Sequence, residues 1–314
     1  MPFKVPSLTL NNGTKIPTVG LGCWMGAVGR GQRVFDMCTK ALKAGYRHFD
    51  TAAGYGNEAQ VGAAIRASGI PRSEIYITTK LGVNHTNVKE SFEASLKELD
   101  CGYIDLYLIH WPQITRPDDS SKAYRPDEHP NFIDAWKEME KFVETGKVKT
   151  IGVSNFSVKT LKKLIPHCSI IPATNQVESH PCLPQNDLKT FCEEKGILLT
   201  AYSPLGRSAT FFSEPTITRI ADKLKTSPAQ VVLSWGVQRG TIVIPKSEDE
   251  GRMSANITLI ELPTEDMEAI NKIHNQPGMH KSLLTFHKPG GVVFGWTYEE
   301  LGWNMKEGGI VPSG

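Results

Sequence analysis

The sequence predicts an α/β protein folded as a closed (β/α)8 barrel, and three observations lead to this prediction. Short apolar runs alternate along the chain with segments of helical periodicity. Most of these runs are apolar almost throughout, as strands are when helices cover both faces of a parallel sheet. Eight such units fit within about 230 of the 314 residues, which favours a closed barrel over an open doubly wound sheet.

An N-terminal hairpin and eight barrel strands are predicted in order. Asn12-Gly13 lies between two short extended runs, and an Asn-Gly pair supplies the positive φ angles of a tight turn. The apolar runs predicted as barrel strands are residues 18–22, 47–49, 75–79, 104–109, 148–153, 173–177, 197–201 and 241–244.

The segments between these runs carry apolar residues at helical spacing. Two examples are Val34, Cys38, Ala41 and Leu42 in one segment, and Phe132, Trp136, Met139 and Val143 in another. Asn87 and Ser157 stand at positions where a side chain can cap the first turn of a helix.

Two long loops and a C-terminal tail complete the predicted organisation. Residues 112–130 and 205–216 follow the fourth and seventh predicted strands, and loops in these positions build the active face of a barrel. The Gly- and Trp-rich tail, about residues 275–314, shows no run that matches a strand. Because no linker or repeat divides the chain, we predict one domain over residues 1–314, with the barrel at about 18–260.

Composition excludes several classes of function. A net charge of +2 argues against a nucleic-acid or membrane-surface protein. The chain has no run of 18 apolar residues that could span a membrane, and its first residues do not resemble a signal peptide. The six cysteines have irregular spacing, which predicts free thiols in the cytoplasm rather than disulfides or a metal site.

Polar side chains stand at the ends of the predicted strands. Asp50, Lys80 and His110 lie 30 residues apart, one βα unit each, so they should occupy neighbouring positions on one rim of the barrel. Further polar pairs end the later strands: Ser154-Asn155, Asn175-Gln176, Tyr202-Ser203 and Lys246-Ser247. A structural ion pair and a core histidine could account for single residues, but their convergence on one rim favours an active site.

Tyr55 adds a possible proton donor to this rim. A tyrosine, with a reference pKa of about 10, is a weak acid unless a nearby cation stabilises its phenolate. Lys80 can supply that cation, Asp50 can keep it charged, and His110 can hydrogen-bond a carbonyl oxygen beside the phenol. Such a site protonates an oxygen that is gaining negative charge, while the electrons must come from a cofactor.

Seven motifs then give a family resemblance. The runs GYRHFDTAAGYGNE, ITTKLG, DLYLIHWP, GVSNF, NQVESHP, AYSPLG and IPKSEDEGRMSAN resemble the aldo-keto reductases in order and spacing, most closely the aldehyde/aldose-reductase branch, across about residues 6–270. The resemblance implies a TIM barrel closed at its base by the hairpin, which reduces small aldehydes, sugars or keto compounds with NADPH. It assigns Tyr55 as proton donor, Asp50 and Lys80 as its tuning pair, and His110 as substrate orienter. Related enzymes of this branch are monomers or homodimers.

The same resemblance implies cofactor and substrate contacts. Ser154, Asn155 and Gln176 look like the groups that hold the nicotinamide carboxamide, and Tyr202 looks like the aromatic that stacks on its ring. The other implied contacts are Ser203, Leu205 and Gly206 over the pyrophosphate, Lys246, Ser247 and Arg252 on the 2′-phosphate, Asn256 on adenine, and Trp24 and Trp111 in the substrate pocket.

The sequence also departs from the family pattern. Glu248, Asp249 and Glu250 place extra carboxylates beside Lys246-Ser247, which predicts some tolerance of NADH. Ala255 replaces a usual Glu beside adenine. Gly82 stands where related enzymes often have Trp, which predicts a wider pocket.

Other functions remain as alternatives. GLGCWMG nearly spells a dinucleotide-binding fingerprint, but its last glycine is one residue late and no acidic residue follows at the required spacing. A Schiff-base lyase could use Lys80 as nucleophile, although Asp50 would keep that amine protonated. A non-catalytic barrel that binds NADPH and regulates a partner is the second alternative. The sequence leaves open the physiological substrate, the stereochemistry and the favoured direction.

Overall fold

The computed structural model describes residues 5–83, 86–119, 122–206, 210–287 and 290–312. Its centre is a parallel sheet of eight strands in sequential order. They are β3 (Leu21–Gly22), β4 (His48–Asp50), β5 (Tyr76–Leu81), β6 (Ile104–Ile109), β7 (Val148–Ser154), β8 (Thr174–Glu178), β9 (Leu198–Tyr202) and β10 (Ile242–Ile244). Gly20 N donates to Val243 O at 2.9 Å and Val243 N to Thr18 O at 2.8 Å. The first and last strands therefore pair, and the predicted (β/α)8 barrel is confirmed.

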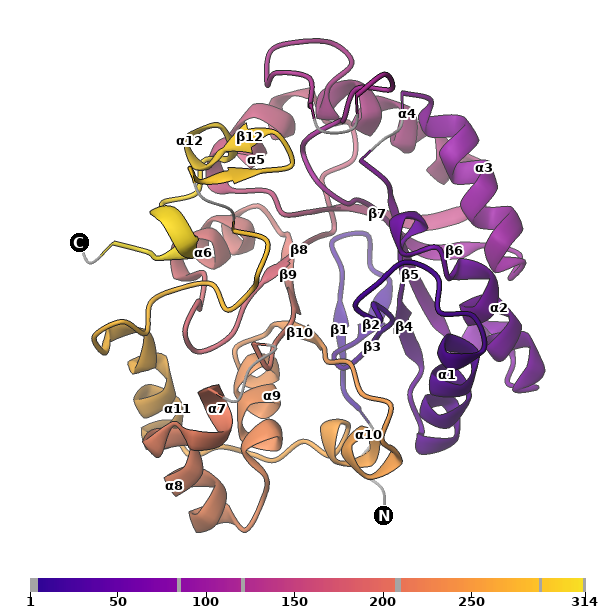
Figure 1. Cartoon of the computed structure of the whole chain (residues 1–314). Coiled ribbons are helices and arrows are strands. Elements are labelled where there is room, and N and C mark those ends of the chain that lie inside the picture. The colour runs from indigo at the N-terminus through magenta and orange to yellow at the C-terminus, as the bar shows by residue number, and fades with distance from the viewer. Residues whose placement is uncertain (1–4, 84–85, 120–121, 207–209, 288–289, 313–314) are drawn as a thin grey trace.

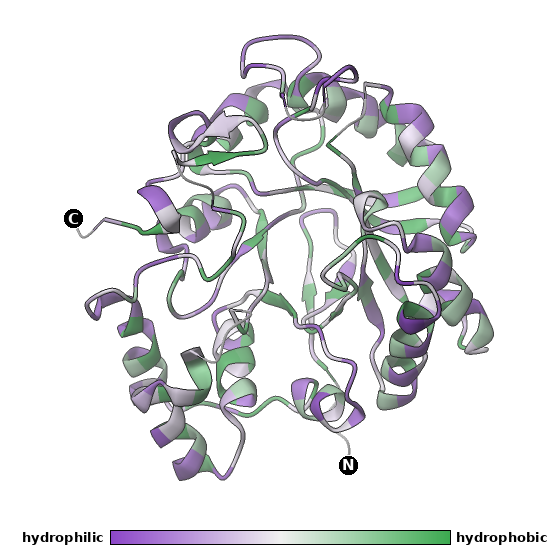
Figure 2. Cartoon of the chain, viewed as in Figure 1, coloured by the Kyte–Doolittle hydropathy of each residue, from purple (hydrophilic) through white to green (hydrophobic). Residues whose placement is uncertain are grey.

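Helices form a ring around this sheet (Figure 1). Those of the repeating units are α1 (Gln32–Ala44), α2 (Glu58–Ala67), α3 (Val88–Leu99), α4 (Phe132–Glu144), α5 (Val158–Leu164), α6 (Asn186–Glu194), α9 (Pro228–Gln238) and α10 (Glu250–Asn256). Between β9 and α9 lie α7 (Thr210–Ser213) and α8 (Pro215–Leu224), and α11 (Thr264–Asn271) follows α10. Hydrophilic residues lie mainly on the outer sides of the helices (Figure 2), as their apolar periodicity predicts.

Local sequence signals account for several element boundaries. The Asn87 side chain accepts a hydrogen bond from Glu90 N and begins α3, and Ser157 and Thr160 form a capping box at the start of α5. Both predicted caps are confirmed. The first barrel strand is shorter than predicted, because only Leu21–Gly22 and an isolated bridge at Val19 have strand geometry.

The N-terminal hairpin pairs β1 (Ser7–Thr9) with β2 (Lys15–Pro17), with Gly13 at φ 82° in its turn. Ile16 of β2 is fully buried and packs in one cluster with Tyr76 and Ile242, the first residues of β5 and β10. The hairpin therefore plugs the amino-terminal end of the barrel, as predicted, and leaves the opposite rim for function.

The tail contains secondary structure that the sequence did not predict. A small hairpin, β11 (Val292–Val293) and β12 (Trp296–Thr297), turns into α12 (Tyr298–Leu301) apart from the barrel sheet. Gln113 Nε2 donates to Val293 O at 2.8 Å, and Trp296 Nε1 donates to Tyr124 O at 2.7 Å. These bonds join the tail to the 112–130 loop, so this loop and the tail form one cover. Across the described residues, no helix combines the length and apolar character needed to cross a membrane.

Candidate active site

The four titratable residues predicted from the strand ends lie together at the carboxyl-terminal rim. Asp50 is the last residue of β4, Lys80 is the penultimate residue of β5, and His110 directly follows β6. Tyr55 ends a short 3-10 turn, Ala53–Tyr55, between β4 and α2. Because β4, β5 and β6 are adjacent parallel strands, a spacing of one βα unit brings these side chains together.

Asp50 and Lys80 form a buried ion pair. Lys80 Nζ donates to Asp50 Oδ1 at 2.5 Å and to Thr51 O at 2.8 Å, while Gln176 Nε2 donates to Asp50 Oδ2 at 2.7 Å. The side chains are 0% and 2% exposed for Lys80 and Asp50. Burial by itself lowers the pKa of Lys80, but the charges of Asp50 and Tyr55 outweigh it and leave the pKa raised. Lys80 is therefore an ammonium group.

Tyr55 lies between this ammonium and His110. Lys80 Nζ is 5.1 Å from the centre of the Tyr55 ring, and the ring centres of Tyr55 and His110 are 5.6 Å apart. Trp24 also packs against Tyr55, at 5.0 Å between ring centres. Burial, with a smaller contribution from Lys80, lowers the pKa of His110 well below its usual value. The imidazole is neutral at physiological pH and can donate one hydrogen bond to a substrate oxygen.

The amide and hydroxyl residues implied for the nicotinamide form one network beside these four residues. Ser154 Oγ donates to Gln176 O at 2.8 Å, and Asn155 Nδ2 donates to His110 O at 2.9 Å. Tyr202 Oη donates to Asn155 Oδ1 at 2.8 Å. Since Gln176 also bonds Asp50, the predicted cofactor contacts and the catalytic candidates share hydrogen bonds. An amide-rich set of this kind fits a carboxamide ligand.

The residues implied for the pyrophosphate follow β9. Ser203 and Gly206 take positive φ angles of 46° and 69°, and Gly206 N donates to Ser203 O at 2.8 Å. Leu205 packs against the main core, and residues 207–209 of the predicted 205–216 loop lie outside the described residues.

Lys246, Ser247 and Arg252 surround the turn from β10 into α10. Asp249 N donates to Ser247 Oγ at 3.2 Å, and the Asp249 side chain caps α10 by accepting from Arg252 N at 2.8 Å. Asn256 is buried at the end of α10. Two cations and a hydroxyl at one turn supply the donors that a phosphate monoester requires, so this set fits the adenosine end of NADPH.

Comparison with known sequences identifies the family. Residues 18–275 match the profile of the Aldo/keto reductase family. The chain belongs to this family. It is therefore an oxidoreductase, and the predicted family, fold and enzyme class are confirmed.

Individual aldo/keto reductases are similar over most of their length. Glycerol 2-dehydrogenase (NADP(+)) of Saccharomyces cerevisiae is 45% identical over 86% of this chain and 91% of its own. D-galacturonate reductase of Hypocrea jecorina is 40% identical over 92% and 97%. The crystal structure of an aldo-keto reductase of Bombyx mori in complex with NADP superposes with a TM-score of 0.79, at 35% identity over 86% and 93% of the two chains. NADP in two of these names agrees with the predicted cofactor.

Aromatic residues of the tail complete the rim of this aldo/keto reductase. Trp111 packs against Phe286, Phe294 and Trp303, with ring centres 5.6, 4.9 and 6.1 Å away. The sequence identified Trp111 as a pocket residue but not Phe286 or Phe294. Only the aromatic content of the tail could have indicated that these two side chains reach the rim. Trp296 is buried and bonded to the 112–130 loop.

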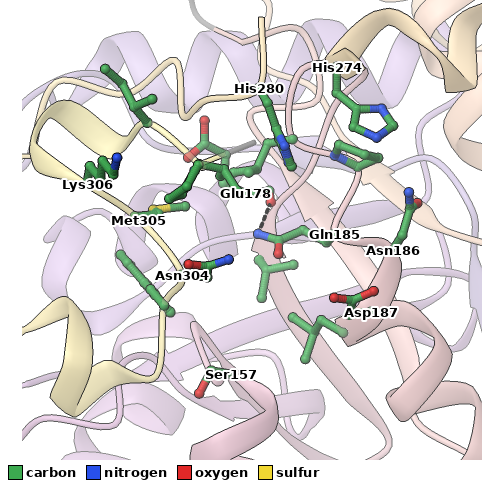
Figure 3. A pocket seen from close by; sticks show the side chains of 18 of the residues that line it. Ser157, Glu178, Gln185, Asn186, Asp187, His274, His280, Asn304, Met305 and Lys306 are labelled. Carbon is green, nitrogen blue, oxygen red and sulfur yellow. Dashed lines mark hydrogen bonds between the residues drawn. The ribbon is translucent and has the colours of Figure 1, made fainter. Parts of the chain in front are cut away.

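A cavity of about 1070 Å³ lies beside the rim, between the segment after β8 and the tail. Asn155 and Tyr202 form part of its wall, whereas Tyr55 and His110 do not line it. In the close-up of Figure 3, Gln185 donates to the backbone oxygen of Glu178 (3.0 Å). The cavity therefore borders the implied cofactor contacts rather than Tyr55, the candidate proton donor.

Glu178 anchors the tail at this cavity. Its carboxylate accepts hydrogen bonds from Ser282 Oγ at 2.6 Å and Leu283 N at 2.8 Å, and His180 Nε2 lies 2.8 Å away. Burial raises the pKa of Glu178, but the interaction with His180 and the smaller contributions of the bonds from Ser282 and Leu283 outweigh burial and leave the pKa below its usual value. Glu178 is thus an anion that fixes the start of the tail to the end of β8.

Proposed function

We propose that the chain is an NADPH-dependent carbonyl reductase that uses Tyr55 as proton donor to convert aldehydes or ketones into alcohols. One observation carries the assignment of the site: a fully buried ammonium, Lys80, held by Asp50 and lying 5.1 Å from the centre of the Tyr55 ring. A cation in this position stabilises a phenolate and so makes the tyrosine a stronger acid.

The reaction needs a hydride and a proton. Bound NADPH supplies the hydride for the carbonyl carbon. Tyr55 gives its phenolic proton to the carbonyl oxygen, and Lys80 stabilises the phenolate that remains. Asp50 keeps Lys80 charged and in place. Neutral His110 donates a hydrogen bond to the same oxygen. The two donors therefore stabilise the negative charge that develops on the carbonyl oxygen in the transition state.

The chain's own residues would hold the cofactor along the rim. Ser154, Asn155 and Gln176 would bind the carboxamide, and Tyr202 would support the ring. Lys246, with Ser247 and Arg252, would bind the 2′-phosphate through charge-assisted hydrogen bonds. The remaining implied contacts are Ser203, Leu205 and Gly206 on the pyrophosphate and Asn256 on adenine.

The finer properties follow from the same reasoning. We infer that small aldehydes, sugars or keto compounds are the substrates, bound between Trp24 and Trp111, because Gly82 adds no side chain to the pocket wall. We further propose one domain with the barrel at about residues 18–260 and the tail at about 275–314, as a monomer or homodimer. The six cysteines carry free thiols, which supports a reducing compartment such as the cytoplasm.

A Tyr55→Phe variant tests the proton donor. It should bind NADPH as the wild type does, while turnover of a panel of sugars, short aldehydes and keto acids falls about 10²-fold or more. Tyr103→Phe is a matched control. Tyr103 directly precedes the first residue of β6, at the end of this strand away from His110, and its hydroxyl donates to the backbone oxygen of Arg72 at 3.4 Å. Wild-type turnover in Tyr55→Phe would refute the assignment.

The two alternatives make different predictions for the same protein. A Schiff-base lyase would be trapped by borohydride with its substrate through Lys80, but that amine is buried, charged and hydrogen-bonded to Asp50 and Thr51. A regulatory barrel would bind NADPH without oxidising it in the presence of any carbonyl compound. Consumption of NADPH with substrate separates both from a reductase.

A further inference from the structure

Glu248 lies between two cations at the implied 2′-phosphate site. Arg33 Nη2 donates to Glu248 Oε1 at 2.8 Å, and Arg33 Nε donates to Oε2. The second cation is Lys246, whose Nζ donates to Oε1 of the same carboxylate. The carboxylate therefore occupies one of the three N–H donors of Lys246, which a phosphate would otherwise be able to use.

The bridge joins two elements that are distant in sequence. Arg33 lies in the first turn of α1, and Lys246 follows β10. The hydrogen bond from Arg33 is the main reason why the pKa of Glu248 is lowered to about 2, with a further contribution from Lys246. Glu248 is therefore an anion throughout the physiological pH range.

The other carboxylates of the same turn lie beside other cations. Asp249 caps α10 and lies 3.8 Å from Nε of Arg252, which is also an implied phosphate ligand but is not hydrogen-bonded by its side chain to Asp249, and Glu250 lies 3.8 Å from Lys40. Glu248 is 28% exposed and Lys246 35% exposed. Ion pairs near the surface contribute little to stability, so a dianionic ligand can displace Glu248 from Lys246.

We propose that Glu248 is a specificity-determining residue, which competes with the 2′-phosphate of NADPH for Lys246 and so weakens the preference for NADPH over NADH. The inference rests on the proposed function, because it takes Lys246 as a 2′-phosphate ligand. Binding of NADPH either separates Glu248 from Lys246 or leaves a carboxylate beside the phosphate, and both lower affinity. NADH has a ribose hydroxyl at this position and leaves the bridge intact.

A Glu248→Gln variant tests the competition, because glutamine keeps the size of the side chain and removes its charge. NADPH should bind about fivefold to tenfold more tightly, as expected for loss of one like charge near a partly exposed phosphate. The dissociation constant for NADH should change less than twofold. Quenching of protein fluorescence measures both constants without turnover.

Two further variants separate the contact from general charge effects. Glu250→Gln removes the same charge from a side chain that is 72% exposed and contacts Lys40 instead, so both dissociation constants should stay within twofold of wild type. In a Lys246→Ala background, Glu248→Gln should no longer tighten NADPH binding severalfold, since the contested cation is absent.

The outcomes distinguish this inference from the proposed function. If wild type binds NADPH and reduces carbonyl compounds, but Glu248→Gln leaves the ratio of the two dissociation constants unchanged, the inference alone is wrong. An equal gain in Glu250→Gln would also overturn it. A wild type that binds no NADPH would overturn both.

Discussion

A Lys80→Met variant would test the electrostatic part of the proposed mechanism. Lys80 Nζ lies 5.1 Å from the centre of the Tyr55 ring. At an effective dielectric constant of about 20, a unit charge at this distance stabilises a phenolate by about 3 kcal/mol. Because each 1.4 kcal/mol is about tenfold in rate, we expect turnover to fall about 10²-fold. Methionine has a similar length and fills the same space without charge.

The variant also leaves Asp50 buried without its partner, which destabilises a protein by about 3–5 kcal/mol. An Asp50→Asn/Lys80→Met double variant is therefore the matched control, since it removes both charges from the core. It should recover much of the lost stability in urea unfolding, while turnover stays low. Initial rates of NADPH oxidation and NADPH binding by fluorescence separate chemistry from folding. Folded variants that reduce aldehydes within twofold of the wild-type rate would refute the electrostatic role of Lys80.

Two further predictions concern pH. Since burial and Lys80 hold the pKa of His110 well below its usual value, kcat/KM should stay level from about pH 7.5 to 6; a decline that follows an ordinary histidine titration would contradict this. Glu178 has a lowered pKa despite its burial. It therefore stabilises the folded protein at pH values above its unfolded-state pKa of about 4.3, and this contribution is lost as pH falls through its folded-state pKa. At neutral pH, Glu178→Gln should lower the free energy of unfolding by about 1–3 kcal/mol. It should also speed hydrogen exchange of the Leu283 amide, which donates to Glu178, and unchanged exchange would disprove the anchoring role.

The group of titratable residues at the rim could be predicted from the sequence, because their positions follow from local sequence features. Each of Asp50, Lys80 and His110 ends an apolar run, and one βα unit separates each from the next. Parallel strands place their carboxyl ends on the same side of a barrel, so chain order alone brings the three residues together. The hairpin was equally predictable, since Asn12-Gly13 encodes its turn.

Contacts that depend on tertiary packing could not be predicted in this way. Arg33 and Glu248 are separated by 215 positions, and no periodicity relates them. The strands of the tail hairpin have two residues each, too few to show alternation. Phe286 and Phe294 reach Trp111 only because the tail folds back over the rim, which no local signal specifies.

The burial of Asp50 and Lys80 is itself an argument for function. A buried ion pair contributes little to stability, and well-packed apolar residues often replace one without loss. The barrel nevertheless surrounds this pair with three hydrogen bonds, from Lys80 to Asp50 and Thr51 and from Gln176 to Asp50. Stability does not require that arrangement. The arrangement is needed to keep a positive charge in a fixed position beside Tyr55. An ammonium group that could move or lose its proton would not stabilise the phenolate of Tyr55.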